Sequence, residues 1–136
     1  MVAFRVRVGK RTRIGEGMTT ATNDQGVVTG QVGGVPTAQG YSFSRALPAQ
    51  WQNGKMSLLP VQRGEHAVPA AINNRGQIVG GHWLWERGRQ YDLNSFVSER
   101  SGWTHLQAKA INNRGLIAGW GEFRGKTRAF LLTPIK

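Results

Sequence analysis

One six-residue sequence, AINNRG, occurs twice in this chain, at 71–76 and at 110–115, and a variant, ATNDQG, occupies 21–26. Asparagine side chains hydrogen-bond to nearby backbone and tolerate left-handed conformations, and glycine accepts the positive φ that such a turn requires. Each copy is followed by a short apolar run, such as QIVGG or LIAGW. The repeat therefore predicts three equivalent hairpin turns, which we place at 23–26, 73–76 and 112–115.

A second element alternates with these turns. Its three copies align without a gap and are FRVRVGKRTRI at 4–14, AQWQNGKMSLL at 49–59 and WLWERGRQYDL at 83–93. Each copy has a glycine three positions after an apolar residue, which is Val6, Trp51 or Trp85. This spacing predicts another hairpin with its turn at Gly9, Gly54 or Gly88. A second apolar residue lies eight positions after the first. The two are expected to pair across the hairpin, Trp51 with Leu59 and Trp85 with Leu93.

Two alternating hairpins give about four strands to each repeat. Corresponding residues of the second hairpin recur at intervals of 45, 34 and 47 residues, at Val6, Trp51, Trp85 and Leu132. Repeats of about 40–45 residues with four strands each are typical of propeller blades. We therefore expect an all-β fold of antiparallel four-stranded repeat units, propeller-like, with about three units. A small β-barrel or sandwich is the alternative.

The organisation is that of one repeat domain over residues 1–136. Nineteen glycines and a low content of charged residues, 18%, favour many short strands joined by tight turns over long helices. The units are expected at approximately 3–48, 49–82 and 83–128, with a partial unit at 129–136. Trp51, Trp83 and Trp85 alternate with other residues along their strands and are expected in the core.

The sequences AINNRGQIVGG...WLWERGRQYDLNSFV and SGWTHLQAKAINNRGLIAGWGEFRGKTRAFLLTP resemble the HAF-repeat proteins, also called extracellular repeat proteins. The resemblance is specific over 68–134, whereas 3–60 keeps only the outline. It implies a propeller-like array of four-stranded units, often in exported bacterial proteins. It brings no established catalytic residues to this chain.

About three units are fewer than the ~4–8 blades of closed propellers. Such an array would expose strand edges and apolar blade faces, so we expect self-association as a homodimer. In the arrangement that we expect, strand 129–133 of each chain lies beside the partner's N-terminal hairpin and buries Phe4 and Phe130. A monomer whose units curl into a tight barrel or sandwich is the alternative.

The chain is strongly basic, with 18 Lys and Arg against 7 Asp and Glu and a formal charge of +11. This balance favours a polyanion as partner, either nucleic acid or an acidic polysaccharide. The expected register places Arg7 opposite Arg13, and like charges facing each other in a sheet favour an anion between them. The candidate ligand-binding cluster in the N-terminal hairpin is Arg5, Arg7, Lys10, Arg11 and Arg13. A solvated outer face is the alternative.

Two further tryptophans, Trp103 and Trp120, lie outside the repeated core positions. An exposed aromatic side chain among arginines can stack a base or a sugar ring, so both are candidate ligand-binding residues. Packing between units is the other interpretation.

Several classes of function lack a sequence signal. The chain has no cysteine, and His66, His82 and His105 lack the spacing of metal ligands. The turn asparagines lack the ligand pattern of a calcium loop. We expect no metal site and no cofactor. The N-terminus lacks the apolar run of a signal peptide and no segment is long enough to span a membrane, so a cytoplasmic location is the default, although the resembled family is often exported.

The leading hypothesis for function is a non-enzymatic binding or scaffold module. The alternative is a small hydrolase or lyase with a site at the axis of an assembled β-propeller. Only Asp92 and Glu99 form a carboxylate pair in a loop-rich region where acid and base roles could be shared. A pocket that holds two or more convergent titratable groups would favour the enzyme.

Overall fold

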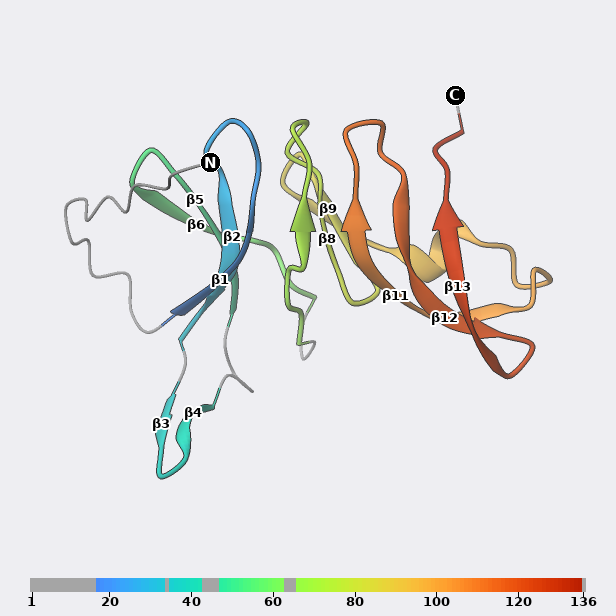
Figure 1. Cartoon of the computed structure of the whole chain (residues 1–136), viewed down its shortest axis with the longest axis horizontal. Helices are drawn as coiled ribbons and strands as arrows, with labels where there is room; N and C mark the ends of the chain where they lie inside the picture. Colours follow the sequence, from blue (N-terminus) through green and yellow to red (C-terminus); the bar gives the residue numbers. More distant parts are fainter. Residues whose placement is uncertain (1–16, 34, 43–46, 63–65, 136) are drawn as a thin grey trace, which may run out of the picture.

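The computed structural model describes residues 17–33, 35–42, 47–62 and 66–135. Within these residues the chain forms thirteen strands and one 3₁₀ turn, η1, at Leu93–Phe96, and no α-helix. Eleven of the strands build three antiparallel sheets of four, four and three strands, and none of these sheets closes into a barrel. The three sheets lie side by side along the longest axis of the molecule (Figure 1). The expected all-β fold of repeated antiparallel units is confirmed.

The first sheet has the strand order β1-β2-β5-β6, the second β10-β9-β8-β7 and the third β11-β12-β13. In the first sheet the strands are β1 Gly17–Thr22, β2 Val28–Val32, β5 Leu47–Gln52 and β6 Lys55–Leu58. In the second they are β7 Ala71–Ile72, β8 Ile78–Gly80, β9 Trp83–Glu86 and β10 Arg89–Asp92. In the third they are β11 Trp103–Ile111, β12 Ile117–Phe123 and β13 Lys126–Leu132.

Each sheet is a meander in which every strand pairs with the next strand of the repeat. A small separate hairpin of β3 Val35–Thr37 and β4 Gly40–Ser42 lies in the connection from β2 to β5. Each sheet begins about half a repeat after the start of the corresponding repeat unit that the sequence predicts. Each sheet therefore combines an asparagine-turn hairpin with the hairpin that follows it, as β7–β8 and β9–β10 do in the second sheet.

The three asparagine turns have the same geometry, as predicted. In each, the side-chain Oδ1 of the first asparagine accepts hydrogen bonds from the backbone N–H groups two and four residues later, at 2.9–3.1 Å. The glycine of each turn donates its N–H to the carbonyl oxygen of that asparagine. These glycines have φ values of 79°, 79° and 82° at Gly26, Gly76 and Gly115. Positive φ explains why glycine occupies this position.

The second type of hairpin has a different register from the one expected. Trp51 pairs with Met56 and Trp85 with Gln90, so the expected pairs with Leu59 and Leu93 are wrong. The reason is the length of the turn: only Asn53-Gly54 and Arg87-Gly88 lie between the strands, all with positive φ. Such two-residue turns match the twist of the strands and bring closer residues together. The expected pairing of Arg7 with Arg13 used the same register, and both residues lie outside the described part of the chain.

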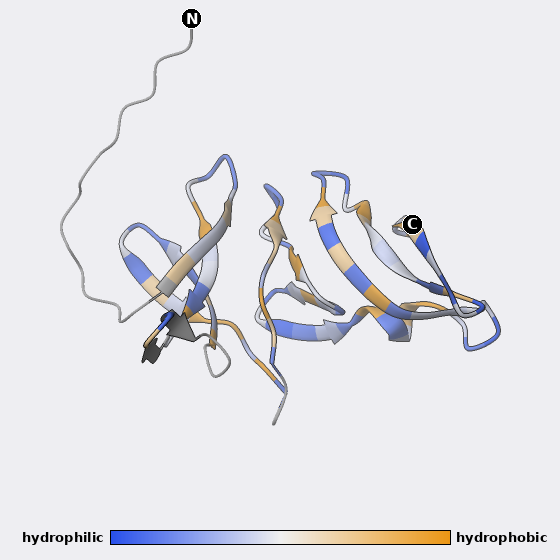
Figure 2. Cartoon of the chain, turned by 60° about the horizontal axis from the view of Figure 1, so that its bottom comes forward, coloured by the Kyte–Doolittle hydropathy of each residue, from blue (hydrophilic) through white to orange (hydrophobic). Residues whose placement is uncertain are grey.

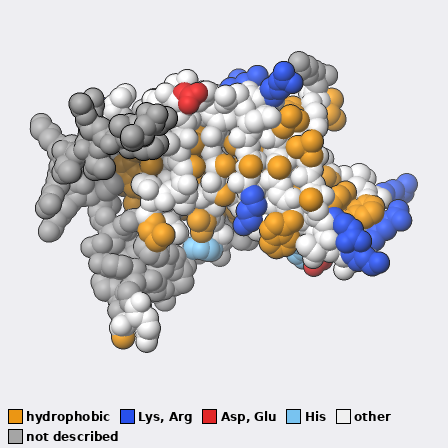
Figure 3. Space-filling view, in the orientation of Figure 1, with side chains coloured by type: hydrophobic (Ala, Val, Ile, Leu, Met, Phe, Trp, Pro, Cys, Tyr) orange, Lys and Arg blue, Asp and Glu red, His pale blue; other side chains and the backbone are white. Residues whose placement is uncertain are grey.

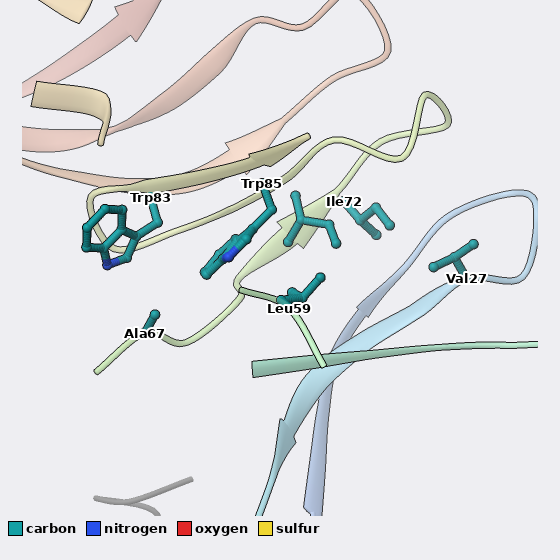
Figure 4. Close-up of a cluster of buried hydrophobic side chains, with 7 residues drawn as sticks. Val27, Leu59, Ala67, Ile72, Trp83 and Trp85 are labelled. Atoms are coloured by element: carbon teal, nitrogen blue, oxygen red, sulfur yellow. The ribbon is translucent and has the colours of Figure 1, made fainter. Parts of the chain in front are cut away.

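The core lies between the sheets rather than within one of them. Between the first and second sheets, Val27, Leu59 and Ala67 pack against Ile72, Ile78, Trp83 and Trp85 (Figure 4). Trp83 and Trp85 are each 2% exposed, which confirms their expected place in the core, whereas Trp51 is half-buried. A second cluster fills the space between the second and third sheets and contains Val79, Leu84, Leu93, Leu106, Ala108, Ile117 and Phe130.

The burial of Phe130 corrects one expectation. Its side chain is buried inside the chain, against the second sheet, and needs no partner chain to cover it. Hydrophobic and hydrophilic residues alternate along β11, as expected for a strand with different environments on its two faces (Figure 2). Among the described residues, no helix is long and apolar enough to cross a membrane.

Candidate functional site

The asparagine turns of neighbouring sheets are hydrogen-bonded to one another. Asn23 donates from Nδ2 to the carbonyl oxygen of Asn73 at 3.0 Å, and Asn73 repeats this bond to Asn112 at 2.9 Å. The next residue of each turn adds a second bond, because the N–H groups of Asp24 and Asn74 donate to the side-chain oxygens of Asn74 and Asn113. We call this row of turns the asparagine ladder. It fixes the spacing of the three sheets at one edge of the molecule.

A cleft of about 530 Å³ opens beside the ladder, between the first and second sheets. Its floor includes Trp85 and Leu59, which belong to the buried cluster between these sheets. Amide and hydroxyl side chains line its walls, and they are Asn23, Gln25, Gln50, Gln52, Ser57 and Asn74. We call this space the first cleft.

Several of these polar groups are available to a ligand. The side chains of Gln50, Gln52 and Ser57 make no hydrogen bond to any other described residue, and Gln50 and Ser57 are cross-strand neighbours on β5 and β6. Paired positions in an antiparallel sheet place their side chains on the same face. The strands therefore present adjacent hydrogen-bonding groups toward the cleft.

Charged groups enter the first cleft from the second sheet. Arg75 comes from the second turn of the asparagine ladder and Arg87 from the β9–β10 hairpin, and both side chains are exposed. Glu86 also lines the cleft, and its Oε1 accepts a hydrogen bond from Gln77 at 2.9 Å. Among the described residues, the lining thus offers two arginines and one carboxylate. An anion with hydroxyl groups has the chemistry that this set of side chains can bind.

The corresponding space between the second and third sheets has a different character. It measures about 400 Å³ and includes the apolar side chains of Leu84, Phe96, Ile117 and Leu132. The polar lining is therefore a property of the first cleft and not of every junction between sheets.

Of the candidate ligand-binding residues that the sequence singled out, the structure describes Trp103 and Trp120. Arg5, Arg7, Lys10, Arg11 and Arg13 lie outside the described residues. Trp103 is half-buried and packs against the core, with its ring centroid 5.1 Å from that of Phe123 and 6.2 Å from that of Phe130. This is the packing interpretation. Trp120 instead is 45% exposed on β12.

Arg75 and Arg87 were not among the candidate residues that the sequence indicated. Arg75 lies in the repeated turn itself, and Arg87 lies in the turn of the second hairpin, so both could have been recognised as exposed turn residues. Their common cleft follows only from the stacking of the sheets. On the face shown in Figure 3, Lys and Arg side chains also gather at the end of the molecule that carries the β12–β13 hairpin.

Two of the described carboxylates each lie beside a histidine. Asp92 Oδ1 lies 3.2 Å from His82 Nδ1 and also accepts from the N–H of Asn94, where it caps η1. Glu122 Oε2 lies 3.2 Å from His105 Nδ1. Within the described ranges, no group of three or more His, Asp or Glu residues could hold a metal ion. Glu99 lines a different surface hollow, with Trp103 and His105. The hydrolase or lyase hypothesis concerns an assembled ring and stays a prediction.

Comparisons of the chain with protein-family models, with curated proteins and with solved structures found no match.

Proposed function

We propose that this protein is a non-enzymatic binding module of the HAF-repeat type and that its ligand, a segment of an acidic polysaccharide, binds in the first cleft. The observation that supports the proposal is the combination of two exposed arginines with amide and hydroxyl groups that no described residue pairs, in one space between two sheets. The sugar hydroxyls would pair with Gln50, Gln52 and Ser57. A carboxylate or sulfate group of the sugar would pair with Arg75 and Arg87.

The overall charge supports a polyanion rather than a neutral sugar. A formal charge of +11 raises the local concentration of an anionic polymer and speeds its association. The basic residues of the N-terminal segment, Arg5, Arg7, Lys10, Arg11 and Arg13, would add contacts to a long polymer. Nucleic acid is the competing polyanion, and the test separates the two.

The test compares binding of polygalacturonate oligomers and of a single-stranded oligonucleotide by titration calorimetry. The double variant Arg75→Ala/Arg87→Ala is expected to weaken polygalacturonate binding at least about tenfold, since each charge-assisted hydrogen bond contributes roughly 1.5–3 kcal/mol. The control is Arg100→Ala/Arg128→Ala, which removes the same charge from two exposed arginines outside the cleft lining. Equal losses in the two double variants, or tighter binding of the oligonucleotide, would overturn the proposal.

A neutral variant tests the sugar contacts separately. Gln50→Ala/Ser57→Ala leaves the charge unchanged and removes two cross-strand neighbours from the cleft wall. It should weaken polygalacturonate binding and leave oligonucleotide binding unchanged. An unchanged polygalacturonate affinity would mean that charge alone attracts the polymer.

We also propose that the module self-associates. The third sheet exposes large apolar side chains, with Leu131 62% and Trp120 45% exposed. Sedimentation equilibrium tests this, because the chain mass is 15.0 kDa and a dimer would have twice that mass.

A further inference from the structure

The third sheet has one covered and one uncovered face. Ile117 on β12 and Phe130 on β13 point into the cluster between the second and third sheets. Side chains alternate between faces along a strand, so Ala118, Trp120 and Leu131 point the other way. The cross-strand pairs Ala118–Leu131 and Trp120–Ala129 place these side chains together. We call this surface, which also includes Ala110 opposite Ala118, the outer face of the third sheet.

The same repeat positions are buried in the second sheet. Leu84 corresponds to Leu131 and is 7% exposed, whereas Leu131 is 62% exposed. Val79 corresponds to Ala118 and is buried beneath the third sheet. The outer face of the third sheet is therefore the kind of surface that a following sheet covers elsewhere in this molecule.

The asparagine ladder is also open at this end. Asn73 uses its Nδ2 to bond to the next turn, but the Nδ2 of Asn112 has no partner among the described residues. The N–H of Asn113, which corresponds to the bonded N–H of Asn74, has no partner there either. Within the described chain, the third sheet thus leaves two donors free.

At the opposite end of the ladder, the acceptors of the first turn receive no bond from a preceding sheet in the described chain; the Thr22 hydroxyl occupies the Asn23 carbonyl at 3.4 Å and also donates to the Val27 carbonyl at 3.0 Å. The carbonyl oxygen of Asn73 accepts from its own turn and also from Asn23, whereas the carbonyl of Asn23 accepts, among the described residues, only from Thr22 and Gly26 of its own turn. Asp24 uses Oδ2 to accept from Asn74, and its Oδ1 has no partner in the described part of the chain. Each intersheet step of the ladder includes one bond from a first asparagine and one from the next residue, so the two ends are complementary.

The first sheet has a matching receiving face. Val28, Trp51 and Met56 are cross-strand neighbours on the side of this sheet that faces away from the second sheet, and all three are half-buried. Val28 is the repeat equivalent of Ile78, and Trp51 is the repeat equivalent of Trp85. In the second sheet, Ile78 and Trp85 face the preceding sheet, which is the first. Trp85 donates from Nε1 to the carbonyl oxygen of Pro60 at 2.7 Å, whereas the buried Nε1 of Trp51 has no acceptor among the described residues. Val28 and Trp51 thus occupy the repeat positions through which the second sheet contacts the sheet before it.

We propose that the outer face of the third sheet binds the first sheet of a second copy of this chain, head to tail, and that the asparagine ladder continues across the contact. Asn112 would donate to the carbonyl of Asn23 of the partner subunit, and the N–H of Asn113 to the carboxylate of Asp24 of the partner subunit. The inference rests on the proposed self-association. Two copies would contribute six sheets, within the ~4–8 blades that close a ring.

Charge favours the same orientation. Asp24 is exposed at the acceptor end of the ladder, and Arg114 is exposed at the donor end, next to Asn113. The two ends would therefore meet with opposite charges. A face-to-face contact between two third sheets would instead bring two copies of Arg114 to the same side and leave both acceptor ends empty.

Disulfide trapping tests this contact, because the chain contains no cysteine of its own. Asp24→Cys and Asn113→Cys copies are purified separately, mixed and oxidised under mild conditions. The expected result is a cross-linked dimer that contains one copy of each variant, since positions 24 and 113 would be as close as positions 24 and 74 are within one chain. The double variant Asp24→Cys/Asn74→Cys is the positive control for this spacing, because it should close a disulfide within one chain.

The outcomes separate this inference from the proposed self-association. If wild-type protein keeps the single-chain mass at all concentrations, both proposals fail. If it forms a dimer but Asn113→Cys copies cross-link only to one another, self-association stands and the head-to-tail contact is overturned. A mixed cross-link that is at least several-fold more abundant than either homodimer supports the inference.

A surface variant checks the apolar part of the contact. Leu131→Asp should raise the dimer dissociation constant by at least about tenfold, because it places a charge in a buried apolar contact. Phe96→Asp is the control, since Phe96 is 52% exposed but lies on η1, away from the outer face of the third sheet. Equal effects of the two variants, or no effect of Leu131→Asp, would overturn the inference.

Discussion

Asn73 donates from Nδ2 to the carbonyl oxygen of Asn112 across 2.9 Å, although 39 residues separate the two in the chain. The same amide group also donates to Gln77 Oε1, while its Oδ1 accepts from the N–H groups of Arg75 and Gln77. One nearly buried side chain thus closes its own turn and joins two sheets. Four hydrogen bonds of one residue depend on the orientation of a single amide.

The first prediction concerns this amide. Asn73→Asp keeps the acceptor for the turn but replaces both donor bonds with a buried negative charge that faces oxygen atoms. The free energy of unfolding should fall by about 2–4 kcal/mol, because a buried polar group loses its partners. Urea unfolding followed by circular dichroism measures the loss.

The matched control for that change is Asn53→Asp. Asn53 is exposed in a two-residue turn with positive φ, where asparagine and aspartate are both favoured. Its free energy of unfolding should stay within about 0.5 kcal/mol of wild type. Similar losses in the two variants would show that charge, and not the ladder, sets the stability.

A second prediction concerns Gly80, which follows the repeated turn in the second sheet. A Cβ atom at this position would collide with the carbonyl oxygen of Val68, and the equivalent Gly30 and Gly119 are confined in the same way by Met18 and Gln107. Gly80→Ala should lower the free energy of unfolding by about 3 kcal/mol, because backbone atoms would have to move.

The control is Gly88→Asn, in the β9–β10 turn. Gly88 has a φ of 76°, and a Cβ atom at this position would have no neighbour within 4 Å. The only cost is therefore the left-handed backbone, about 1 kcal/mol for asparagine. Thermal unfolding ranks the two variants. A Gly80→Ala protein as stable as Gly88→Asn would contradict the close approach of the strands.

A third prediction separates the two tryptophans of the third sheet. Trp103→Ala removes ring contacts with Phe123 and Phe130 and should cost about 2–4 kcal/mol of unfolding free energy. Trp120→Ala, at an exposed position, should change the stability of the single chain by less than about 0.5 kcal/mol and should weaken self-association. Unfolding at low protein concentration and sedimentation at high concentration measure the two effects. Equal destabilisation by both would mean that Trp120 also packs inside the chain.

A fourth prediction concerns the basic N-terminal segment, for which the sequence predicts a hairpin. If its arginines bind polyanions, affinity for a single-stranded oligonucleotide should fall steeply as salt rises, since each neutralised phosphate releases a counterion. Arg7→Glu/Arg13→Glu should abolish that binding. Arg100→Glu/Arg128→Glu changes the net charge equally at exposed positions elsewhere and should retain most of it. Filter binding at several salt concentrations tests this prediction. An affinity that depends neither on salt nor on the first double variant would exclude the N-terminal arginines as the site.

Local sequence is enough to specify the three asparagine turns and the fold class. The asparagine side chain and the glycine act on backbone groups within four residues, as the bonds of Asn23 Oδ1 to the N–H groups of Gln25 and Val27 illustrate. Such short-range chemistry is readable without a structure. The alternation of apolar residues also placed Trp83 and Trp85 correctly in the core.

Which faces and clefts exist depends instead on how the sheets stack. Leu84 and Leu131 occupy the same repeat position, and one is buried and the other exposed because a further sheet covers only the first. Gln50 and Arg87 line one cleft although they come from different sheets. Burial and cleft formation are set by contacts between residues far apart in the chain, whereas turn formation depends on neighbours in sequence.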